Sequence, residues 1–141
     1  MGIQQSDCSI PCFILIDDNL GDLHLMEVAL KRVFAHAKVY TFESGEGFQK
    51  AWKKMEQEPL EIHACFVDYC MPGMSGKDVL RYLMKHAKLS CPVYLFSGAL
   101  LPALKKEMLE MGATDFLEKP IDFDALIELV SGLFAQQLPA A

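Results

Sequence analysis

Residues 12–18 read CFILIDD, a continuously apolar run that ends on two acids. An apolar run without polar alternation is typical of a strand that is covered on both faces, as in a parallel sheet between two layers of helices. Apolar residues then recur at helical spacing from about Gly21 to Phe34. This part of the chain therefore predicts a strand, Cys12 to Ile16, that leads into an amphipathic helix.

The same alternation of strand and helix continues along the chain. Ser44 suits a helix N-cap, Pro59 breaks the chain ahead of the third strand, and Gly112 suits a left-handed helix stop. Five strands, each followed by a helix, predict an α/β fold with a parallel five-stranded sheet and helices on both faces. The other predicted elements are strands 38–42, 62–67, 92–96 and 115–118, a helix carrying Phe48, Trp52 and Met55, and helices 75–86, 100–111 and 123–136.

Length and composition limit the classes of protein to which the chain can belong. Its 141 residues suffice for one domain, and its net charge of −6 argues against binding to nucleic-acid phosphates. No apolar run approaches the roughly 20 residues that span a bilayer, and residues 1–11 do not resemble a signal peptide. We therefore expect a cytoplasmic protein with free thiols. Cys65 is expected in the core, and Cys8 and Cys12 lack the second pair that a zinc site needs.

Polar residues stand at the ends of four predicted strands. Asp17 and Asp18 follow the first strand, Asp68 the third, Ser97 the fourth and Lys119 the fifth. The carboxyl ends of parallel strands share one edge of the sheet, where such folds place their functional residues. Singly, the paired acids could be a helix cap and the lysine a surface residue. Three converging carboxylates repel one another unless a cation lies among them, which favours a Mg²⁺ site.

Four segments of the sequence together resemble the signature of response-regulator receiver domains. Each segment alone occurs by chance, whereas the four in this order, on an alternating strand–helix pattern, are specific. The resemblance covers residues 12–137, leaving 1–11 as an N-terminal extension and 138–141 as a tail, and implies the flavodoxin-like (CheY-like) fold. The segments are Asp17-Asp18, residues 68–76 (DYCMPGMSG), Ser97-Gly98-Ala99 and Lys119-Pro120.

The resemblance implies a phosphorylatable switch rather than an enzyme. Asp68 is then expected to take a phosphoryl group from a sensor histidine kinase, a histidine phosphotransfer protein or a small acyl phosphate, and to lose it slowly. Mg²⁺ would be held by Asp17, Asp18, Asp68 and the backbone carbonyl of Cys70, with Asp18 favoured over Asp17 as a direct ligand. The metal would offset the repulsion between the carboxylate and the phosphoryl group.

The resemblance also implies phosphoryl contacts and a switch. Lys119 is expected to contact the phosphoryl oxygens, and the hydroxyl of Ser97 to donate a hydrogen bond to one of them. That contact would draw the Ser97 loop inward and favour an inward Phe116. Phe116 lacks the hydroxyl that tyrosine brings to this position in the family, so a purely core role competes evenly. The family pattern places a cis peptide bond before Pro120.

Other functions remain as alternatives. An unphosphorylated protein-binding scaffold is disfavoured because every acid and the lysine are present. Asp17-Asp18-Asn19 would repel the phosphate of a flavin cofactor, and Cys70 stands where an aspartyl hydrolase commonly has a second acid. We expect the domain to pass on its signal by docking a partner protein on the face made by the fourth helix, fifth strand and fifth helix. Leu100, Leu101 and Leu104 supply apolar groups there. The sequence leaves open the partner, pairing of the expected monomer on phosphorylation, and whether the domain is stand-alone or excised.

Overall fold

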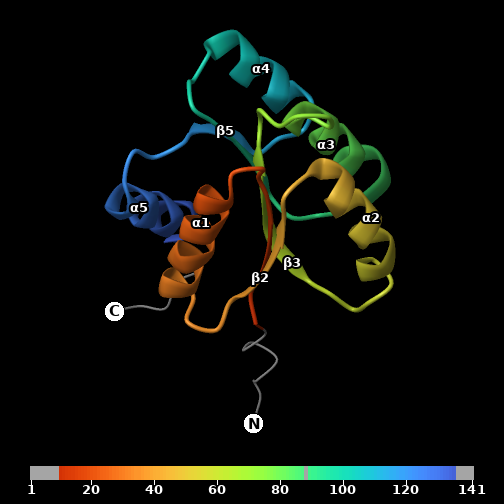
Figure 1. Ribbon diagram of the computed structural model, residues 1–141, viewed down its shortest axis with the longest axis horizontal. Helices are drawn as coiled ribbons and strands as arrows, with labels where there is room; N and C mark the ends of the chain where they lie inside the picture. The colour runs from red at the N-terminus through yellow and green to blue at the C-terminus, as the bar shows by residue number, and fades with distance from the viewer. Residues whose placement is uncertain (1–9, 88, 136–141) are drawn as a thin grey trace.

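The computed structural model describes residues 10–87 and 89–135, which contain one five-stranded sheet. All neighbouring strands are parallel, in the order β2-β1-β3-β4-β5 (Figure 1). The predicted α/β sheet is confirmed. The strands are β1 (Cys12–Ile16), β2 (Lys38–Phe42), β3 (Ile62–Asp68), β4 (Val93–Ser97) and β5 (Asp115–Glu118).

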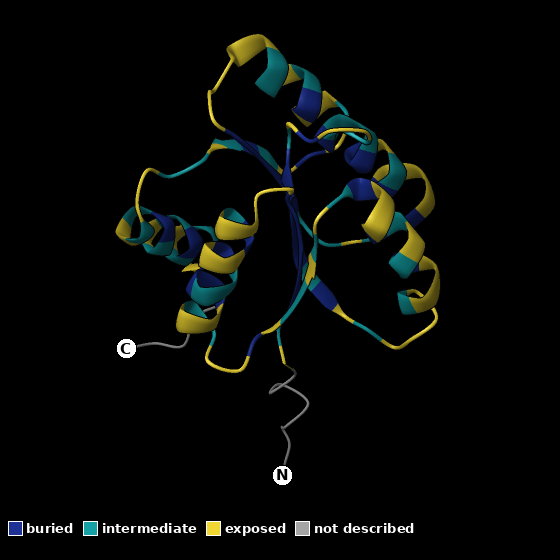
Figure 2. Ribbon diagram, in the orientation of Figure 1, coloured by how far each residue is buried: buried dark blue, intermediate teal, exposed yellow. Residues whose placement is uncertain are grey.

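Helices cover both faces of the sheet and divide the core into two parts. Helices α1 and α5 lie side by side on one face, and α2, α3 and α4 lie on the other (Figure 1). Alternate residues of β1 serve the two parts: Phe13 and Leu15 face α1 and α5, whereas Ile14 and Ile16 face α2 and α3. The inner strands β1, β3 and β4 are accordingly almost entirely buried in Figure 2, whereas the edge strands β2 and β5 are partly exposed. The helices are α1 (Leu20–Val33), α2 (Gly45–Met55), α3 (Gly76–Tyr82), α4 (Pro102–Glu110) and α5 (Phe123–Leu133).

Side-chain caps fix where most of these helices begin. Asn19, Ser44 and Asp122 each accept a hydrogen bond from a backbone N–H in the first turn of α1, α2 and α5. Ser75 does the same for α3 and forms a reciprocal capping box with Asp78. The predicted cap at Ser44 is therefore confirmed.

Several predicted element boundaries change in the structure. The helix expected over 75–86 is α-helical only to Tyr82 and continues as the π-helical segment η2 (Leu83–Ala87), whose wider turn buries both Leu83 and Ala87. The helix expected to start at 100 starts at Pro102, because proline suits the first turn of a helix. Gly112 has φ 116° and ends α4 as predicted. Residue 136, the predicted end of the last helix, lies outside the described residues.

The bond before Pro120 also differs from the family expectation. Among the described residues no peptide bond is cis, so the expected cis bond at Pro120 is wrong. A trans bond before proline is favoured by roughly 0.5–1 kcal/mol, so trans is the ordinary state.

No helix in the described part of the chain is long and apolar enough to cross a membrane.

Candidate functional site

Three carboxylates converge at the carboxyl ends of the neighbouring strands β1 and β3. From β1 the chain crosses to β2 on one side and then to β3 on the other side, so the strand order reverses at this point. Asp17 and Asp18 directly follow β1, and Asp68 is the last residue of β3, the strand next to β1. Oxygen atoms of the three side chains all lie within 4.8 Å of one another. Asp17 and Asp68 are largely buried, whereas Asp18 is exposed to solvent. The structure thus brings together the acids that the sequence predicted to meet.

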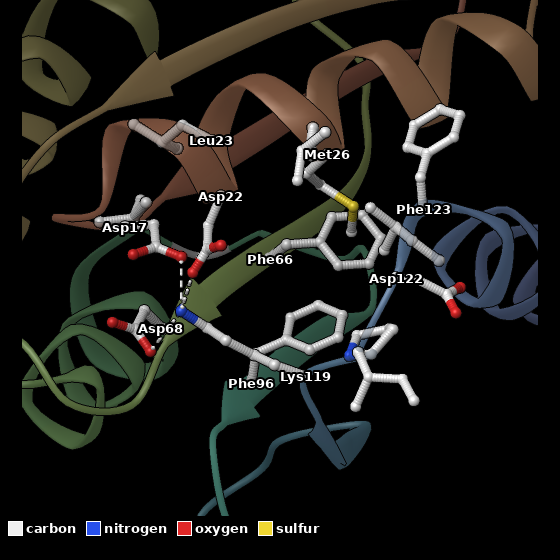
Figure 3. A pocket seen from close by; sticks show the side chains of 15 residues that line it. Asp17, Asp22, Leu23, Met26, Phe66, Asp68, Phe96, Lys119, Asp122 and Phe123 are labelled. Carbon is white, nitrogen blue, oxygen red and sulfur yellow. Dashed lines mark hydrogen bonds and ion pairs between the residues drawn. The ribbon is translucent and has the colours of Figure 1, made fainter.

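Lys119 reaches this cluster from the end of β5. Its backbone N–H donates to the carbonyl of Ser97, 2.8 Å away, which continues the pairing of β4 and β5 beyond the last strand residue. Its Nζ lies 3.0 Å from Oδ2 of Asp17, 2.7 Å from Oδ2 of Asp22 and 3.4 Å from Oδ1 of Asp68 (Figure 3). One ammonium group therefore faces carboxylates from three elements.

Asp22 is the member of the site that the sequence reasoning missed. It lies in the first turn of α1, and its backbone N–H donates to Oδ1 of the cap residue Asn19 at 2.9 Å. The N–H of Asn19 in turn donates to Oδ1 of Asp17, also at 2.9 Å. This chain of hydrogen bonds turns the start of α1 toward the cluster. The sequence did offer a signal for this residue: Asp22 lies in the first turn of the helix that begins directly after the acid pair Asp17-Asp18.

The electrostatics of the site show an excess of negative charge. Burial, together with repulsion from Asp17, raises the pKa of Asp68 to about 7, although Lys119 acts in the opposite direction. Burial lowers the pKa of Lys119, but the carboxylates of Asp22 and Asp17 outweigh it and raise that pKa overall. Lys119 therefore stays charged, and its single charge does not balance the acids around it.

This excess predicts a dependence of stability on pH in the metal-free protein. The pKa of Asp68 rises on folding from its ordinary 3.8 to about 7, so its contribution is fully present below pH 3.8 and is lost as pH rises to about 7. The loss is at most about 4 kcal/mol. Urea unfolding without metal should show Asp68→Asn more stable than wild type above about pH 8 and equally stable near pH 4. Parallel profiles for the two proteins would contradict the assignment.

The donor set fits a hard divalent cation such as Mg²⁺. Mg²⁺ prefers oxygen ligands at about 2.0–2.1 Å, so two ligands on one ion lie no more than about 4 Å apart. Oxygens of the three carboxylates lie within 4.8 Å of one another, so small side-chain shifts would bring them to this spacing, and their uncompensated charge supplies the attraction. Cys70, whose backbone carbonyl was predicted as a further ligand, lies two residues after Asp68, and its side chain is exposed. Its carbonyl as a ligand stays a prediction.

Ser97 is the last residue of β4, the strand beside β3, and Phe116 lies on β5, the strand beyond β4. Phe96 is the register partner of Asp68, so Ser97 lies one residue beyond it, with its Oγ accepting a hydrogen bond from the N–H of Ala99 at 3.3 Å. Phe116 is fully buried and packs edge-to-face on Tyr69, with ring centroids 5.5 Å apart. Phe116 thus already points inward and touches the residue that follows Asp68.

A cavity of about 170 Å³ adjoins the carboxylates between α1 and the segment after β5 (Figure 3). Asp17, Asp68 and Lys119 form its polar end. The apolar wall limits access of water to Lys119 and strengthens its ion pairs. The wall includes Leu23, Met26, Phe66, Phe96 and Phe123.

Comparison with known proteins gives consistent results. The family model described as "Response regulator receiver domain" matches residues 13–131. The chain is 32% identical over 146 residues to two-component response regulator ORR4 of Oryza sativa subsp. indica, covering 91% of this chain and 62% of ORR4. It is 32% identical over 114 residues to ORR12 of Oryza sativa subsp. japonica, covering 80% of this chain and 89% of ORR12.

The fold is also found among solved structures. The Mn²⁺-bound form of response regulator Rcp1 superposes with a TM-score of 0.75 at 18% identity, covering 93% of this chain and 96% of Rcp1. At 18% identity, this similarity shows that the two proteins share a fold and nothing about their roles. The chain spans less than two thirds of ORR4, so the activities and partners of that whole protein are not carried over by the match.

Proposed function

This chain belongs to the response regulator receiver domain family, and we propose that Asp68 is its phosphoacceptor, working with Mg²⁺ bound beside it. The observation that carries the proposal is the arrangement around Asp68. Two further carboxylates lie within 4.8 Å of it, and the Nζ of Lys119 lies 3.4 Å from its Oδ1. A buried nucleophilic carboxylate with a metal-type donor set on one side and a cation on the other suits phosphoryl transfer.

The proposed metal ligands are Asp17, Asp18, Asp68 and the backbone carbonyl of Cys70, with Asp18 favoured over Asp17 as a direct ligand. The excess negative charge of the cluster and the Mn²⁺ ion named for the similar Rcp1 structure support this choice. When bound, Mg²⁺ would neutralise negative charge on the carboxylates and on the incoming phosphoryl group.

The protein's own groups would divide the chemical work. A carboxylate oxygen of Asp68 attacks the phosphorus of a phosphohistidine, the phosphorus–nitrogen bond breaks, and the imidazole leaves with the electron pair. Lys119 moves its ammonium from the carboxylates to the phosphoryl oxygens, and the hydroxyl of Ser97 donates a hydrogen bond to one of them. Members of the family are phosphoacceptors rather than classic enzymes, and slow loss of the phosphoryl group is the one hydrolytic step we propose.

A conformational switch would link phosphorylation of Asp68 to Phe116 on β5 and to the connection between β4 and α4. Drawing the Ser97 loop toward the phosphoryl group would favour the inward position of Phe116. Phe116 is inward and fully buried in the described structure, which supports its packing role as much as its switch role. Leu100 and Leu101 are exposed on the connection to α4 and would be available to a partner there.

The proposed phosphodonor is a sensor histidine kinase or a histidine phosphotransfer protein in the cytoplasm. The domain would span residues 12–137, of which 136 and 137 lie outside the described residues, as do residues 1–9 and the tail at 138–141. The downstream partner would be a protein rather than nucleic acid, in keeping with the net charge of −6.

Titration with Mg²⁺ followed by beryllofluoride, an analogue of the phosphoryl group, tests the assembly of the site. Calorimetry should detect one Mg²⁺ site, and beryllofluoride should bind only after Mg²⁺ has been added. Asp68→Asn should lose the beryllofluoride step. Binding of beryllofluoride that survives in Asp68→Asn would place the phosphoacceptor elsewhere.

Replacing Asp22 with asparagine is expected to speed phosphorylation of Asp68 by about fivefold. The carboxylate of Asp22 holds Nζ of Lys119 at 2.7 Å, closer than Asp68 does, so it competes with the phosphoryl group for that ammonium. An ion pair with this exposure contributes on the order of 1 kcal/mol, which corresponds to about fivefold in rate. Rates should be measured with a small acyl phosphate. Asp22→Glu, which keeps the charge, is the control, and a slower Asp22→Asn variant would contradict the competition.

A further inference from the structure

Two thiols that do not belong to the carboxylate cluster lie in contact with each other. Cys65 is on β3, three residues before Asp68, and Cys91 is in the bend that precedes β4. Their Sγ atoms are 3.9 Å apart, close enough for one S–H to donate to the other sulfur. The four cysteines of the described residues are all free thiols. The proposed phosphoryl chemistry gives this pair no role.

The pairing of β3 with β4 brings the two sulfurs together. Cys65 is the register partner of Val93, and its N–H donates to the carbonyl of Pro92 at 2.9 Å. Cys91 is two residues before Val93, in the bend that leads into β4. Both cysteines pack in the part of the core that lies under α2, α3 and α4. The register of β3 against β4 therefore keeps the two cysteines next to each other.

The two cysteines differ in their access to solvent. Cys65 is fully buried, whereas Cys91 is partly exposed on its bend. A small oxidant can therefore meet Cys91 but not Cys65 in the folded protein. A bend outside regular structure can also shift its side chain, which the closure of 3.9 Å to a bonded distance requires.

We propose that Cys91 and Cys65 form a redox modification site, in which a hydroperoxide oxidises Cys91 and Cys65 resolves the product as an intramolecular disulfide. The thiolate of Cys91 attacks the peroxide, the oxygen–oxygen bond breaks, and Cys91 becomes a sulfenic acid while water or an alcohol leaves after protonation. The thiol of Cys65 then attacks the sulfur of Cys91, loses its proton and expels hydroxide, which together leave as water. Two thiols are oxidised and one hydroperoxide is reduced.

The polarity of the sulfur contact supports these roles. The hydrogen bond between the two sulfurs lowers the pKa of the Cys91 thiol, and the same contact, with burial, raises the pKa of Cys65. Of the two thiols, the more accessible Cys91 is therefore the one that ionises more readily, as a hydroperoxide-reactive cysteine requires. The buried Cys65 keeps its proton until a neighbouring electrophilic sulfur appears.

The bond would close a loop of residues 65–91, which contains Asp68, the segment after it, α3 and η2. It would tie the middle of β3 to the start of β4 without using any side chain of the carboxylate cluster. It would also protect Cys91 from further oxidation to sulfinic acid, which is irreversible for most proteins.

Peptide mapping of the wild-type protein tests the proposal without any phosphodonor. The protein is treated with hydrogen peroxide, its remaining thiols are alkylated, and it is cleaved at lysines and before Asp68. This cleavage places Cys65, Cys70 and Cys91 on three different peptides. A single crosslink between the peptides of Cys65 and Cys91, reversed by a reducing agent, is expected. Alkylated Cys65 and Cys91 after oxidation of the exposed Cys70 would overturn the proposal, as would a crosslink of Cys91 to another cysteine.

Single variants separate the two roles. Cys65→Ser should leave Cys91 without a resolving thiol, so sulfenic and then sulfinic acid should accumulate on Cys91. Cys91→Ser should leave Cys65 reduced under the same treatment because its sulfur is buried. Cys70→Ser is the matched control and should form the same crosslink as wild type. If Cys65→Ser does not fold, Cys65→Ala provides the same test, and the wild-type map stands independently.

Discussion

Substituting Lys119 with methionine is expected to lower the rate of Asp68 phosphorylation by about a hundredfold. The ammonium lies within 3.4 Å of Asp68 and is the cation that contacts Asp17, Asp22 and Asp68 in the described residues. Methionine keeps most of the volume of the side chain but removes the charge that would meet the phosphoryl oxygens. Loss of one such contact typically costs on the order of a hundredfold in rate. The rate should be followed with a small acyl phosphate at saturating Mg²⁺.

A second lysine supplies the control for this variant. Lys105 pairs with Asp115 at 3.5 Å on the surface, and neither residue belongs to the carboxylate cluster. Lys105→Met removes the same charge from the protein and should leave the rate within about twofold of wild type, because surface ion pairs contribute little. Equal losses in both variants would show that overall charge, rather than contact with the phosphoryl group, is what matters.

Gly76→Ala is expected to destabilise the protein by about 2–3 kcal/mol. A Cβ at residue 76 would lie 2.5 Å from the carbonyl oxygen of Asp68 and 2.6 Å from Cα of Tyr69. Both are backbone atoms, so no side-chain rotation relieves the overlap. The N–H of Gly76 also donates to the carbonyl of Tyr69 at 2.9 Å, and this bond would lengthen. Since the strain falls on the end of β3, Mg²⁺ affinity should fall together with the free energy of unfolding.

Gly132→Ala is the matched substitution for that experiment. Gly132 lies in α5, and a Cβ there meets nothing within 4 Å. Alanine inside a helix should stabilise the protein by roughly 0.5–1 kcal/mol, because glycine loses more conformational freedom on folding. Urea unfolding of both variants measures the two effects with opposite signs. A neutral Gly76→Ala variant would contradict the close approach of α3 to the end of β3.

Much of the site could be predicted from the sequence because of where parallel strands end. Asp17 and Asp68 follow apolar runs, and one edge of the sheet collects the carboxyl ends of all five strands. The meeting of Asp17, Asp18 and Asp68 needs only the strand boundaries and no side-chain detail. The flavodoxin-like fold that the family resemblance implied is confirmed, and its strand order places β3 next to β1.

What was missed depends on side-chain reach and on register. Asp22 joins the site because the cap at Asn19 sets the direction of α1, and the approach of Lys119 to it depends on the conformation of a long side chain. The contact of Cys65 with Cys91 depends on how β3 and β4 are aligned, which the apolar pattern of either strand does not specify. The π-helical turn after Tyr82 has no distinct sequence pattern of its own.

The phosphoryl group itself provides the most direct test of the central claim. Wild type and Asp68→Asn are incubated with a small acyl phosphate, with and without Mg²⁺, and intact masses and peptide masses are measured. We predict one added phosphoryl group in wild type, dependent on Mg²⁺, located on the peptide that contains Asp68 and missing from Asp68→Asn. An unmodified wild-type protein that binds Mg²⁺ normally, or a phosphoryl group that persists in Asp68→Asn, would contradict the account.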